Sequence, residues 1–452
     1  MIVVKFGGTS VGDSVAIERL VEVVRGRLPR HPIAVVSAMG GATNALIAIA
    51  ELASAGQLIS AIRGVETLRD RHLTTAEQLL GSSGSAQDVI GELSATFDEL
   101  AALAEALSVL GHATPRSRDA IAAKGEMLSS FLVTAALVAR GIPAEHVDAT
   151  TVMITGDQFG KAEPRQDKIA EASQKILRPL VERGIVPVIG GFIGSTEQGI
   201  VTTLGRGGSD YSASLFGAAL GADAIEIWTD VDGMLTADPR VVQGALLIDR
   251  IRFDEASELA SFGAKVLHPS TITPAVRLGI PVYIYNSRYP EGTGTLITFD
   301  APKRAVRALA GKQGVTVIKV RSPRMLLQHG FLRTLFDVFD RHRTSVDVVA
   351  TSEVSVSVTI DDATHLDTLV VDLSQLGDVS VERNRGIVAI VGAGLTDSSE
   401  SMSRALAALT SLRIYMLSLS ASGINLTILV DGDQVGEAMR RLHAEFFPDG
   451  AP

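Results

Sequence analysis

The chain has 452 residues, too many for one ordinary domain, and its formal net charge of −10 without a Lys/Arg cluster argues against binding to nucleic acid. It contains no cysteine, which excludes disulfides, thiolate metal sites and a cysteine nucleophile. Lys5 and a glycine pair interrupt the apolar N-terminus, and no uncharged apolar run reaches the length of a membrane span, so we expect a cytoplasmic protein without a membrane partner.

Strands followed by glycine turns and helices recur along the first 300 residues. Residues 2–6 predict a buried strand, and Asp13 or Ser14 is expected to cap the helix that follows. Residues 32–38 predict a second strand, which is again followed by a glycine turn and a helix. The pattern returns at residues 184–194, 199–210 and 223–230. This alternation predicts an α/β sandwich with a mostly parallel sheet, whose ligands bind at the carboxyl ends of the strands, where the glycine turns lie.

Near residue 300 the character of the sequence changes, and beyond it one pattern occurs twice. The segment TSEVSVSVTID (351–361) aligns with ASGINLTILVD (421–431), and each unit predicts a strand, a helix, two strands and a further helix. A duplicated small α+β module is typical of a regulatory ligand-binding pair, and a dimerisation appendage would have the same pattern. We therefore expect a catalytic domain over 1–298, a linker over 299–312 and regulatory modules over 313–385 and 386–452.

The first glycine turn, KFGGTS, places Lys5 at the end of a strand, directly before Gly7 and Gly8. Glycine lets backbone N–H groups approach a phosphate closely, and the N-terminus of a following helix favours an anion. The Walker pattern and an ordered G-x-G-x-x-G are both absent, so a tight turn without a ligand remains the alternative.

The segment TLGRGGSD (203–210) surrounds Arg206 with glycines, so its guanidinium can hold a carboxylate or phosphate through two hydrogen bonds. Ser209 and Asp210 then open a helix, where these residue types are also favoured as caps. Glu126, in AAKGEMLSS, begins another predicted helix. It is either a solvated first-turn glutamate or an acceptor for a substrate ammonium, and the spacing does not decide between them.

Two later loops contribute further candidates. WTDVDGMLTADPR (228–240) lacks the glutamate of a calcium-binding EF-hand loop and suggests a loop that contacts ribose and base. FGAKVLHP (262–269) offers Lys265, whereas His268 before a proline suggests a structural turn residue. No Ser-His-Asp arrangement and no HExxH motif is present, so a hydrolase mechanism lacks support.

Five motifs in this order resemble the aspartate kinase family: KFGGTSV, TLGRGGSDYSA, WTDVDG, TADPRVV and SFGAKVLHP. The chain is most similar to the lysine-sensitive type without an appended homoserine dehydrogenase, and the resemblance covers essentially the whole sequence. It implies a three-layer amino-acid-kinase domain followed by two ACT domains of the α+β βαββαβ type. It implies transfer of the γ-phosphoryl group of MgATP to the side-chain carboxylate of L-aspartate, giving 4-phospho-L-aspartate for lysine, threonine and methionine synthesis. ATP and Mg²⁺ are the implied cofactors, L-lysine the implied effector, and a homodimer or homotetramer through the ACT domains the implied assembly.

The resemblance also implies roles for single residues. Lys5 would neutralise the transferring phosphoryl group, and Asp210 would organise the active-site lysines. Arg206 would pair with a substrate carboxylate, helped by Ser209, while Glu126 would hold the substrate ammonium. Further substrate contacts are implied at Ser37, Thr43, Gly207 and Gly208. ATP contacts are implied at Lys5, Gly7, Gly8, Thr229, Asp230, Leu235, Arg240, Lys265 and Val266. Effector contacts are implied at Met325, Gln328, Phe331, Leu332, Ser345, Val346, Asp347, Ser352 and Glu353, and Asp347 and Glu353 would serve the effector's ammonium groups.

Two positions depart from the family pattern. Gln328 replaces a small serine, and the larger amide could alter or abolish lysine inhibition. Leu235 replaces a tyrosine near the adenine, which puts nucleotide affinity in doubt but not the reaction. Met325 and Leu332 are as consistent with the core of the module as with an effector contact.

Two other functions compete with this interpretation. A kinase for another small acid, such as glutamate or N-acetylglutamate, is disfavoured by the combination of GRGGSD with an ACT pair. A catalytically inactive amino-acid sensor acting through the ACT pair is disfavoured because Lys5, Arg206 and Asp210 are all intact.

Overall fold

The computed structural model describes residues 1–81, 84–262, 271–326 and 329–448. It divides into two compact units that do not simply follow one another in the chain. The first unit contains the described residues of 1–234 and 266–299, and the second those of 235–265 and 300–452.

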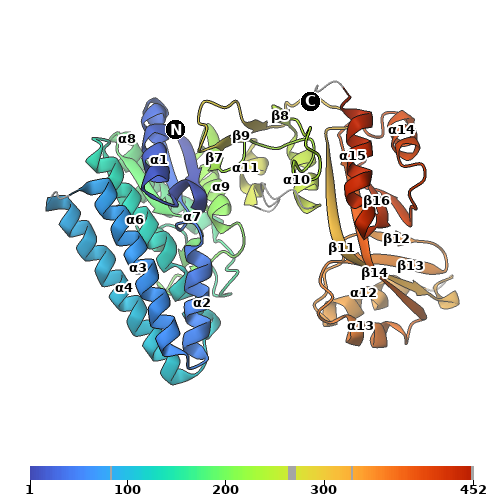
Figure 1. The fold of residues 1–452 in the computed structure, drawn as a ribbon, viewed down its shortest axis with the longest axis horizontal. Coiled ribbons are helices and arrows are strands. Elements are labelled where there is room, and N and C mark those ends of the chain that lie inside the picture. Colours follow the sequence, from blue (N-terminus) through green and yellow to red (C-terminus); the bar gives the residue numbers. More distant parts are fainter. Residues whose placement is uncertain (82–83, 263–270, 327–328, 449–452) are drawn as a thin grey trace. The chain divides into compact units, whose positions relative to one another are not determined.

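A mostly parallel β-sheet forms the centre of the first unit (Figure 1). The strands that this unit contributes to the sheet lie in the order β3-β4-β2-β1-β7-β9-β10, and all of these except β10 pair in parallel. β1 (Ile2–Phe6), β2 (Pro32–Val36) and β4 (Val186–Gly190) are buried along their whole length, as in a sheet that is covered on both faces. The other strands are β3 (Ala144–Val147), β7 (Ala224–Thr229), β9 (Val282–Asn286) and β10 (Thr295–Ile297). The predicted mostly parallel sheet is confirmed.

Helices cover both faces of this sheet and complete the predicted three-layer sandwich. α1 (Ser14–Arg27) and α6 (Lys124–Ala139) pack on one face, and α9 (Gly208–Leu220) packs on the other (Figure 1). Asp13 caps α1 as predicted, because its carboxylate accepts a 2.8 Å hydrogen bond from the backbone N–H of Ala16. The remaining helices of this unit are α2 (Ala42–Ser54), α3 (Leu58–Leu80), α4 (Gly84–Leu110), α5 (Pro115–Ala122), α7 (Gln166–Ala172), α8 (Arg178–Glu182) and α11 (Thr273–Leu278).

The side chains of β1 alternate between the two faces of the sheet, and this alternation determines which of its residues faces α9. Ile2, Val4 and Phe6 lie in the hydrophobic core that includes α1 and α6. Because successive side chains of a strand point to opposite faces, Lys5 is directed toward α9. An otherwise apolar strand thus directs one lysine side chain toward α9, the helix that follows the glycine-rich turn.

The segment 199–210 differs from the prediction. It does not add a parallel strand to the central sheet. Instead, β6 (Val201–Thr203) pairs antiparallel with β5 (Ile193–Ser195) in a separate two-stranded sheet. The glycine-rich turn and α9 follow this hairpin, so Arg206 extends from a small ribbon and not from the end of a central strand.

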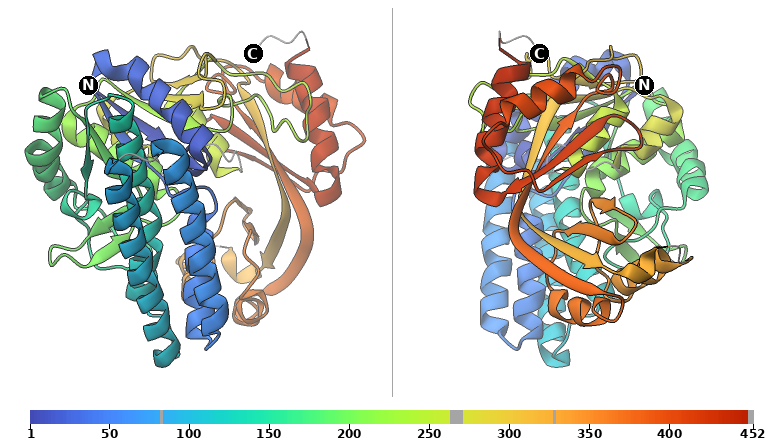
Figure 2. Two further views of the ribbon diagram at one scale, coloured as in Figure 1. Left: turned by 60° about the vertical axis from the view of Figure 1, so that its left-hand side comes forward. Right: turned by 90° about the vertical axis from the view of Figure 1, so that its right-hand side faces the viewer.

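The second unit contains an antiparallel sheet in the order β12-β13-β11-β14-β16-β15. Two strands are long, β11 (Ala308–Arg321) and β14 (Asp378–Val391), and they pair along most of their length (Figures 1 and 2). Residues 316–321 of β11 also pair with β13, and residues 385–391 of β14 also pair with β16. The sheet therefore consists of two four-stranded halves that share both long strands. The short strands are β12 (Val349–Thr351), β13 (Ser355–Ile360), β15 (Met416–Leu419) and β16 (Asn425–Asp431).

The order of elements confirms the predicted duplication. The first copy consists of β11, α12 (Phe331–Arg341), β12, β13 and α13 (Leu366–Leu373). The second copy consists of β14, α14 (Glu400–Ala408), β15, β16 and α15 (Val435–Phe446). Each copy has the strand, helix, two strands and helix that its sequence predicts.

The residues near the expected linker are more structured than the sequence suggests. The linker was expected over 299–312, but β11 begins at Ala308, because residues 308–313 pair with the end of β14. The described part of 235–265, which falls in the expected catalytic domain, belongs to the second unit. It includes β8 (Arg250–Ile251) and α10 (Phe253–Ser261).

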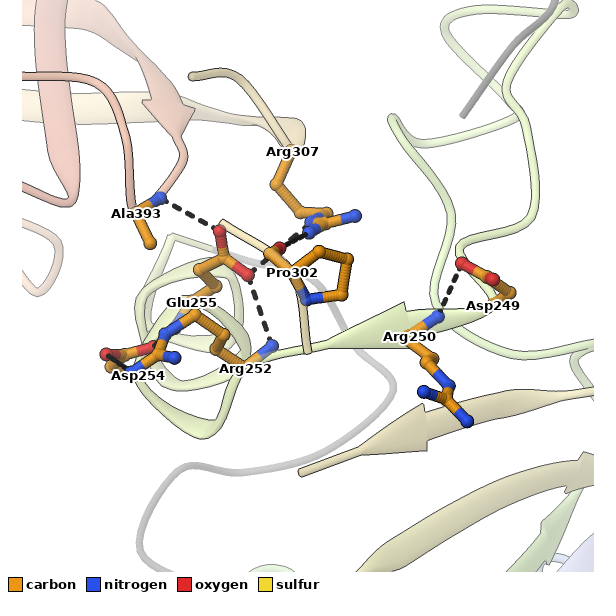
Figure 3. Close-up of polar contacts among 8 residues, drawn as sticks. All are labelled: Asp249, Arg250, Arg252, Asp254, Glu255, Pro302, Arg307 and Ala393. Atoms are coloured by element: carbon orange, nitrogen blue, oxygen red, sulfur yellow. Dashed lines mark hydrogen bonds and ion pairs between the residues drawn. The ribbon is translucent and has the colours of Figure 1, made fainter. Parts of the chain in front are cut away.

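A buried ion pair joins three segments of the second unit (Figure 3). Glu255 in α10 is fully buried, and its carboxylate lies 3.4 Å from the guanidinium of Arg307. The same carboxylate accepts hydrogen bonds from the backbone N–H groups of Ala393 (2.8 Å) and Arg252 (3.1 Å). Since a buried charge is costly without its partners, these contacts hold α10 to Arg307, directly before β11, and to Ala393, just after β14.

Candidate active site

An open cavity of about 710 Å³ in the first unit gathers most of the predicted substrate and phosphate residues. It lies where β1 and β2 end and where α6 and α9 begin, so four distant segments of the chain contribute to it. The predicted residues that line it are Lys5, Gly8, Ser37, Thr43, Glu126, Arg206, Gly207, Gly208, Ser209 and Asp210.

Lys5 and Asp210 form an ion pair on the wall of this cavity. The Nζ atom of Lys5 lies 2.6 Å from Oδ1 of Asp210, and both side chains are largely buried. Asp210 stands in the first turn of α9, where the helix dipole favours a negative charge. The carboxylate therefore fixes the ammonium group of Lys5 in the cavity, beside the glycine turn that follows β1.

The two glycine turns after β1 and β2 are in direct contact. A Cβ atom at residue 8 would lie only 3.0 Å from the carbonyl oxygen of Ala38, so a side chain at Gly8 would push the turns apart. Arg71 of α3 ties the turns together, since its guanidinium donates 2.7 Å hydrogen bonds to the carbonyl oxygens of Gly40 and Gly12. The hydrogen bonds of Arg71 thus stabilise the conformation of the two turns beside Lys5.

Glu126 lies almost completely buried in the first turn of α6, with its side chain at the cavity. Among the described residues, no hydrogen-bond partner is found for its buried Oε2 atom. Burial raises the pKa of Glu126 to about 8, although the N–H of Ala38 and the charge of Lys5 favour the ionised form. The alternative of a solvated first-turn glutamate is therefore wrong, and the arrangement suits a carboxylate that receives an external cation.

Arg206 stands at the tip of the glycine-rich turn and is exposed to the open cavity. Gly207 adopts a φ of 73° at the N-cap position of α9, a conformation that glycine adopts without strain. Gly208 and Ser209 are buried at the start of the helix. The turn therefore places an exposed arginine two residues before a helix N-terminus, and both features favour an anion.

The structure places only some of the predicted nucleotide-binding residues close to one another. Gly7 is close to β7, since its N–H donates a 2.9 Å hydrogen bond to the carbonyl oxygen of Trp228, the residue before Thr229. Asp230 follows at the end of the same strand. The other predicted contacts are not part of this group: Leu235 and Arg240 belong to the second unit, where Arg240 pairs with Asp238, and Lys265 and Val266 lie outside the described residues.

The predicted effector residues divide into core and surface positions. Phe331 is buried, and Met325 and Val346 pack against the same core, as the alternative for Met325 proposed. Leu332 is exposed, so the core alternative is wrong for this residue. The exposed polar positions are Ser345, Ser352 and Glu353, whereas the side chain of Asp347 is partly buried, and Gln328 lies outside the described residues.

Asp347 belongs to a small charged cluster in the second unit. Lys312 Nζ lies 3.7 Å from its carboxylate and also pairs with Asp361. Partial burial, and then the neighbouring Asp361, raise the pKa of Asp347 to about 6, although Lys312 opposes this shift. Ser352 lines a separate cavity of about 210 Å³, together with Lys319 and other residues.

Sequence patterns did not reveal three residues that the structure places at or behind the site. Arg118 and Asp119 line the cavity, and Arg71 supports the glycine turns. All three stand in helices, where a charged residue is most often a solvated surface position. Only burial, which sequence does not reveal directly, separates Asp119 from such residues.

Metal ligands and membrane spans add little to the description of this site. No group of three or more His, Cys, Asp or Glu side chains there could hold a metal ion. One helical stretch, Pro115–Ala139, is long and apolar enough to cross a membrane. However, 72% of its most apolar 18-residue segment is buried inside the protein. Burial of this kind is what a core helix of a folded domain shows.

Comparisons with known proteins agree with the fold. The amino acid kinase family matches residues 1–286, and an ACT domain matches residues 388–446. The lysine-sensitive aspartokinase 3 of Escherichia coli is 37% identical over 456 residues, which is 99% of either chain. The chloroplastic aspartokinase 3 of Arabidopsis thaliana is 36% identical, over 98% of this chain and 81% of that one.

Solved structures give the same result. The R-state crystal structure of E. coli aspartokinase III in complex with aspartate and ADP has a TM-score of 0.86 at 37% identity and covers 99% of this chain and all of that one. The T-state structure of the same enzyme with lysine and aspartate has a TM-score of 0.82 and covers 99% of both chains. Because the similarity extends over essentially the full length of both chains, this chain belongs to the amino acid kinase family and, within it, to the aspartokinases.

Proposed function

We propose that this aspartokinase transfers the γ-phosphoryl group of MgATP to the side-chain carboxylate of L-aspartate, giving 4-phospho-L-aspartate. One observation carries the proposal: the 2.6 Å pair of Lys5 and Asp210 lies in the same cavity as Arg206 and Glu126. A phosphate-neutralising cation thus stands beside groups that complement an amino dicarboxylate. The relative that was solved with aspartate and ADP supports this choice of substrates.

Phosphoryl transfer needs positioning and charge neutralisation more than a covalent nucleophile. Lys5 would neutralise the charge that develops on the transferring group, and Asp210 would keep its ammonium in place. The backbone of Gly7 and Gly8 would line the path of the phosphoryl group. The aspartate carboxylate is already ionised and nucleophilic at neutral pH, so the mechanism requires no strong general base.

The substrate would be bound by complementary charges at its two ends. Arg206 would hold one carboxylate in a bidentate geometry, supported by Ser209 at the helix N-terminus. Glu126 would accept the ammonium group, which is the external cation that its buried carboxylate lacks. Ser37 would add a contact from the turn after β2, and Thr43 would add one from the first turn of α2.

Mg²⁺ would enter as part of the MgATP substrate. This ion is usually bound through substrate phosphates and water, with few protein carboxylates. Thr229 and Asp230, at the carboxyl end of β7 beside β1, would contact the nucleotide, and Leu235, Arg240, Lys265 and Val266 are proposed as further contacts.

We propose L-lysine as the effector, bound at the first regulatory module. The clearest support within the chain is Asp347, a partly buried carboxylate that a cationic ligand would stabilise. The relative solved with lysine and aspartate belongs to the same family. The other proposed contacts are Met325, Gln328, Phe331, Leu332, Ser345, Val346, Ser352 and Glu353. Assembly into a homodimer or homotetramer through the regulatory modules and a cytoplasmic location complete the proposal.

Two alternatives have less support. A kinase for glutamate or N-acetylglutamate would not account for the two regulatory modules. An inactive sensor would not need the fixed pair of Lys5 and Asp210 in an open cavity.

The test is an initial-velocity assay with MgATP and L-aspartate, in which hydroxylamine traps the acyl phosphate, with and without lysine or threonine. Aspartate-dependent hydroxamate that lysine suppresses is the expected result. Turnover that lysine does not change would keep the kinase and reject lysine as effector. Turnover with glutamate in place of aspartate would reject the proposed substrate, and no turnover with any acid would favour the sensor.

A further inference from the structure

Asp119 is a buried carboxylate whose role the reaction described above does not explain. It lies near the end of α5, only seven residues before Glu126, and is 3% exposed. Three donors surround it at 2.9 Å: the backbone N–H groups of Gly160 and Thr203, and the hydroxyl of Thr203. No ion-pair partner of Asp119 is found in the described part of the chain. Its charge is therefore compensated by fixed N–H and O–H groups, an arrangement that is stable only if these donors stay in place.

The donors belong to the two segments that frame the glycine-rich turn. Thr203 ends β6 and stands three residues before Arg206. Gly160 lies in the neighbouring loop, and its carbonyl oxygen would be 3.1 Å from a Cβ atom at Gly205, so the loop and the turn are packed against each other. The N–H of Ala162 in the same loop donates a 2.9 Å hydrogen bond to the carbonyl oxygen of Thr203. One carboxylate thus connects α5, the loop and the hairpin.

Other hydrogen bonds fix the part of the hairpin that is farther from the turn: Ser195 bonds to residues of 150–155, and the hydroxyl groups of Thr202 and Thr155 lie 2.7 Å apart. Asp119 adds the contacts at Thr203, the end of β6 that leads into the glycine-rich turn. β5 and β6 have three residues each and form their own two-stranded sheet, which by itself is marginally stable. The exposed side chain of Arg206 has a flexible stem, so its direction depends on the backbone from which it extends. A guanidinium binds a carboxylate through two parallel hydrogen bonds only when both groups are aligned. A displaced turn would therefore reduce binding of the substrate more than binding of the nucleotide.

We propose that Asp119 is a positioning residue for substrate recognition, which sets the direction of Arg206 by locking Gly160 and Thr203. This proposal rests on the proposed function of Arg206 as the ligand of a substrate carboxylate. It assigns Asp119 no contact with the substrate itself. It predicts that an acid is required at this position, because an amide would direct an NH₂ group or a weaker acceptor at three donors.

The experiment compares Asp119→Asn, Arg206→Lys and the double variant in steady-state kinetics of the full chain. We expect Asp119→Asn to raise KM for aspartate by at least about tenfold, the loss expected for hydrogen bonds to a charged group, with KM for MgATP nearly unchanged. Since Asp119 acts through Arg206, the double variant should resemble Arg206→Lys alone. An unchanged KM for aspartate, independent effects that multiply, or equal changes in both KM values would overturn the proposal.

A second pair of variants covers the case in which Asp119→Asn does not fold. Thr203→Val removes one donor and should raise KM for aspartate, whereas Thr203→Ser keeps the hydroxyl and should behave like the parent. Identical kinetics for these two variants would reject the proposal. If Arg206→Lys leaves KM for aspartate unchanged, the assigned role of Arg206 is wrong, which is distinguishable from a failure at Asp119 alone.

Discussion

The buried carboxylate of Glu126 predicts that substrate binding depends on pH. Its pKa is raised to about 8 in the free site, chiefly by burial. At pH 7 roughly one molecule in eleven therefore has the ionised form that an ammonium group requires. The apparent affinity for aspartate is reduced by the same factor, about elevenfold at pH 7, about twofold at pH 8 and hardly at all at pH 9.

The assay measures KM for aspartate between pH 6.5 and 9 at saturating MgATP. We expect KM to fall about fivefold from pH 7 to 8 and less than about twofold from pH 8 to 9. Glu126→Gln should have a high KM that no longer changes in this range, because the amide cannot ionise. Glu105→Gln, at an exposed position of α4, is the matched control and should follow the parent. A flat KM in the parent, or the same slope in Glu126→Gln, would refute this account.

The same group makes the stability of the substrate-free protein depend on pH. Between pH 4.5 and about 8 the folded state keeps a proton on Glu126 that the unfolded chain releases. Stability is therefore lost as the pH rises through this window, by up to roughly 5 kcal/mol at higher pH if the first unit unfolds as one cooperative unit. Glu126→Gln should remove this loss, which urea unfolding of the two proteins at pH 5 and pH 9 would detect.

Four further predictions concern other parts of the molecule. Lys5→Met should lower kcat by at least about a thousandfold with unchanged circular dichroism, and near-normal turnover would exclude its assigned role. Gly8→Ala should reduce kcat because the new Cβ separates the two glycine turns, whereas Gly26→Ala, with open space around it, should not; equal effects would contradict the argument. Arg307→Met leaves a buried glutamate without its partner and should cost about 3–5 kcal/mol in the unfolding of the second unit, measured in urea; an unchanged midpoint would argue against the buried pair. Lysine inhibition should weaken about tenfold from pH 7 to 5, as Asp347 with its pKa of about 6 becomes protonated, and Asp347→Asn should abolish this dependence; inhibition that is constant over this range would count against Asp347 as the effector's ligand.

The sequence predicts the elements whose signals are local. Buried apolar runs mark the central strands, Asp13 marks the start of α1, and the glycine turns locate the site. Each of these signals is contained in a few consecutive residues, so no knowledge of distant partners is needed.

What the sequence does not predict depends on distant partners. A three-residue strand such as β6 has no feature that distinguishes parallel from antiparallel pairing, so its separate hairpin was missed. Residues 308–313 resemble a linker until the end of β14 pairs with them. Asp119 finds its donors 41 and 84 residues away, and nothing in its own helix indicates them.

The pairing of the two long strands of the regulatory sheet suggests how one half of the sheet could be gained or lost in a single step. Gln313 and Gly386 face each other across β11 and β14, and the chain between them forms the first four-stranded half of the sheet. That half is therefore inserted into the chain at one pair of neighbouring residues, and it also packs on the other half through Val348 and Leu429. An ancestral gene could have acquired it at a single site without breaking any strand pairing. By the same reasoning, a short turn that joins residue 313 to residue 386 should delete the first four-stranded half and, in the second half, remove only the pairing of Arg385 with Asp431.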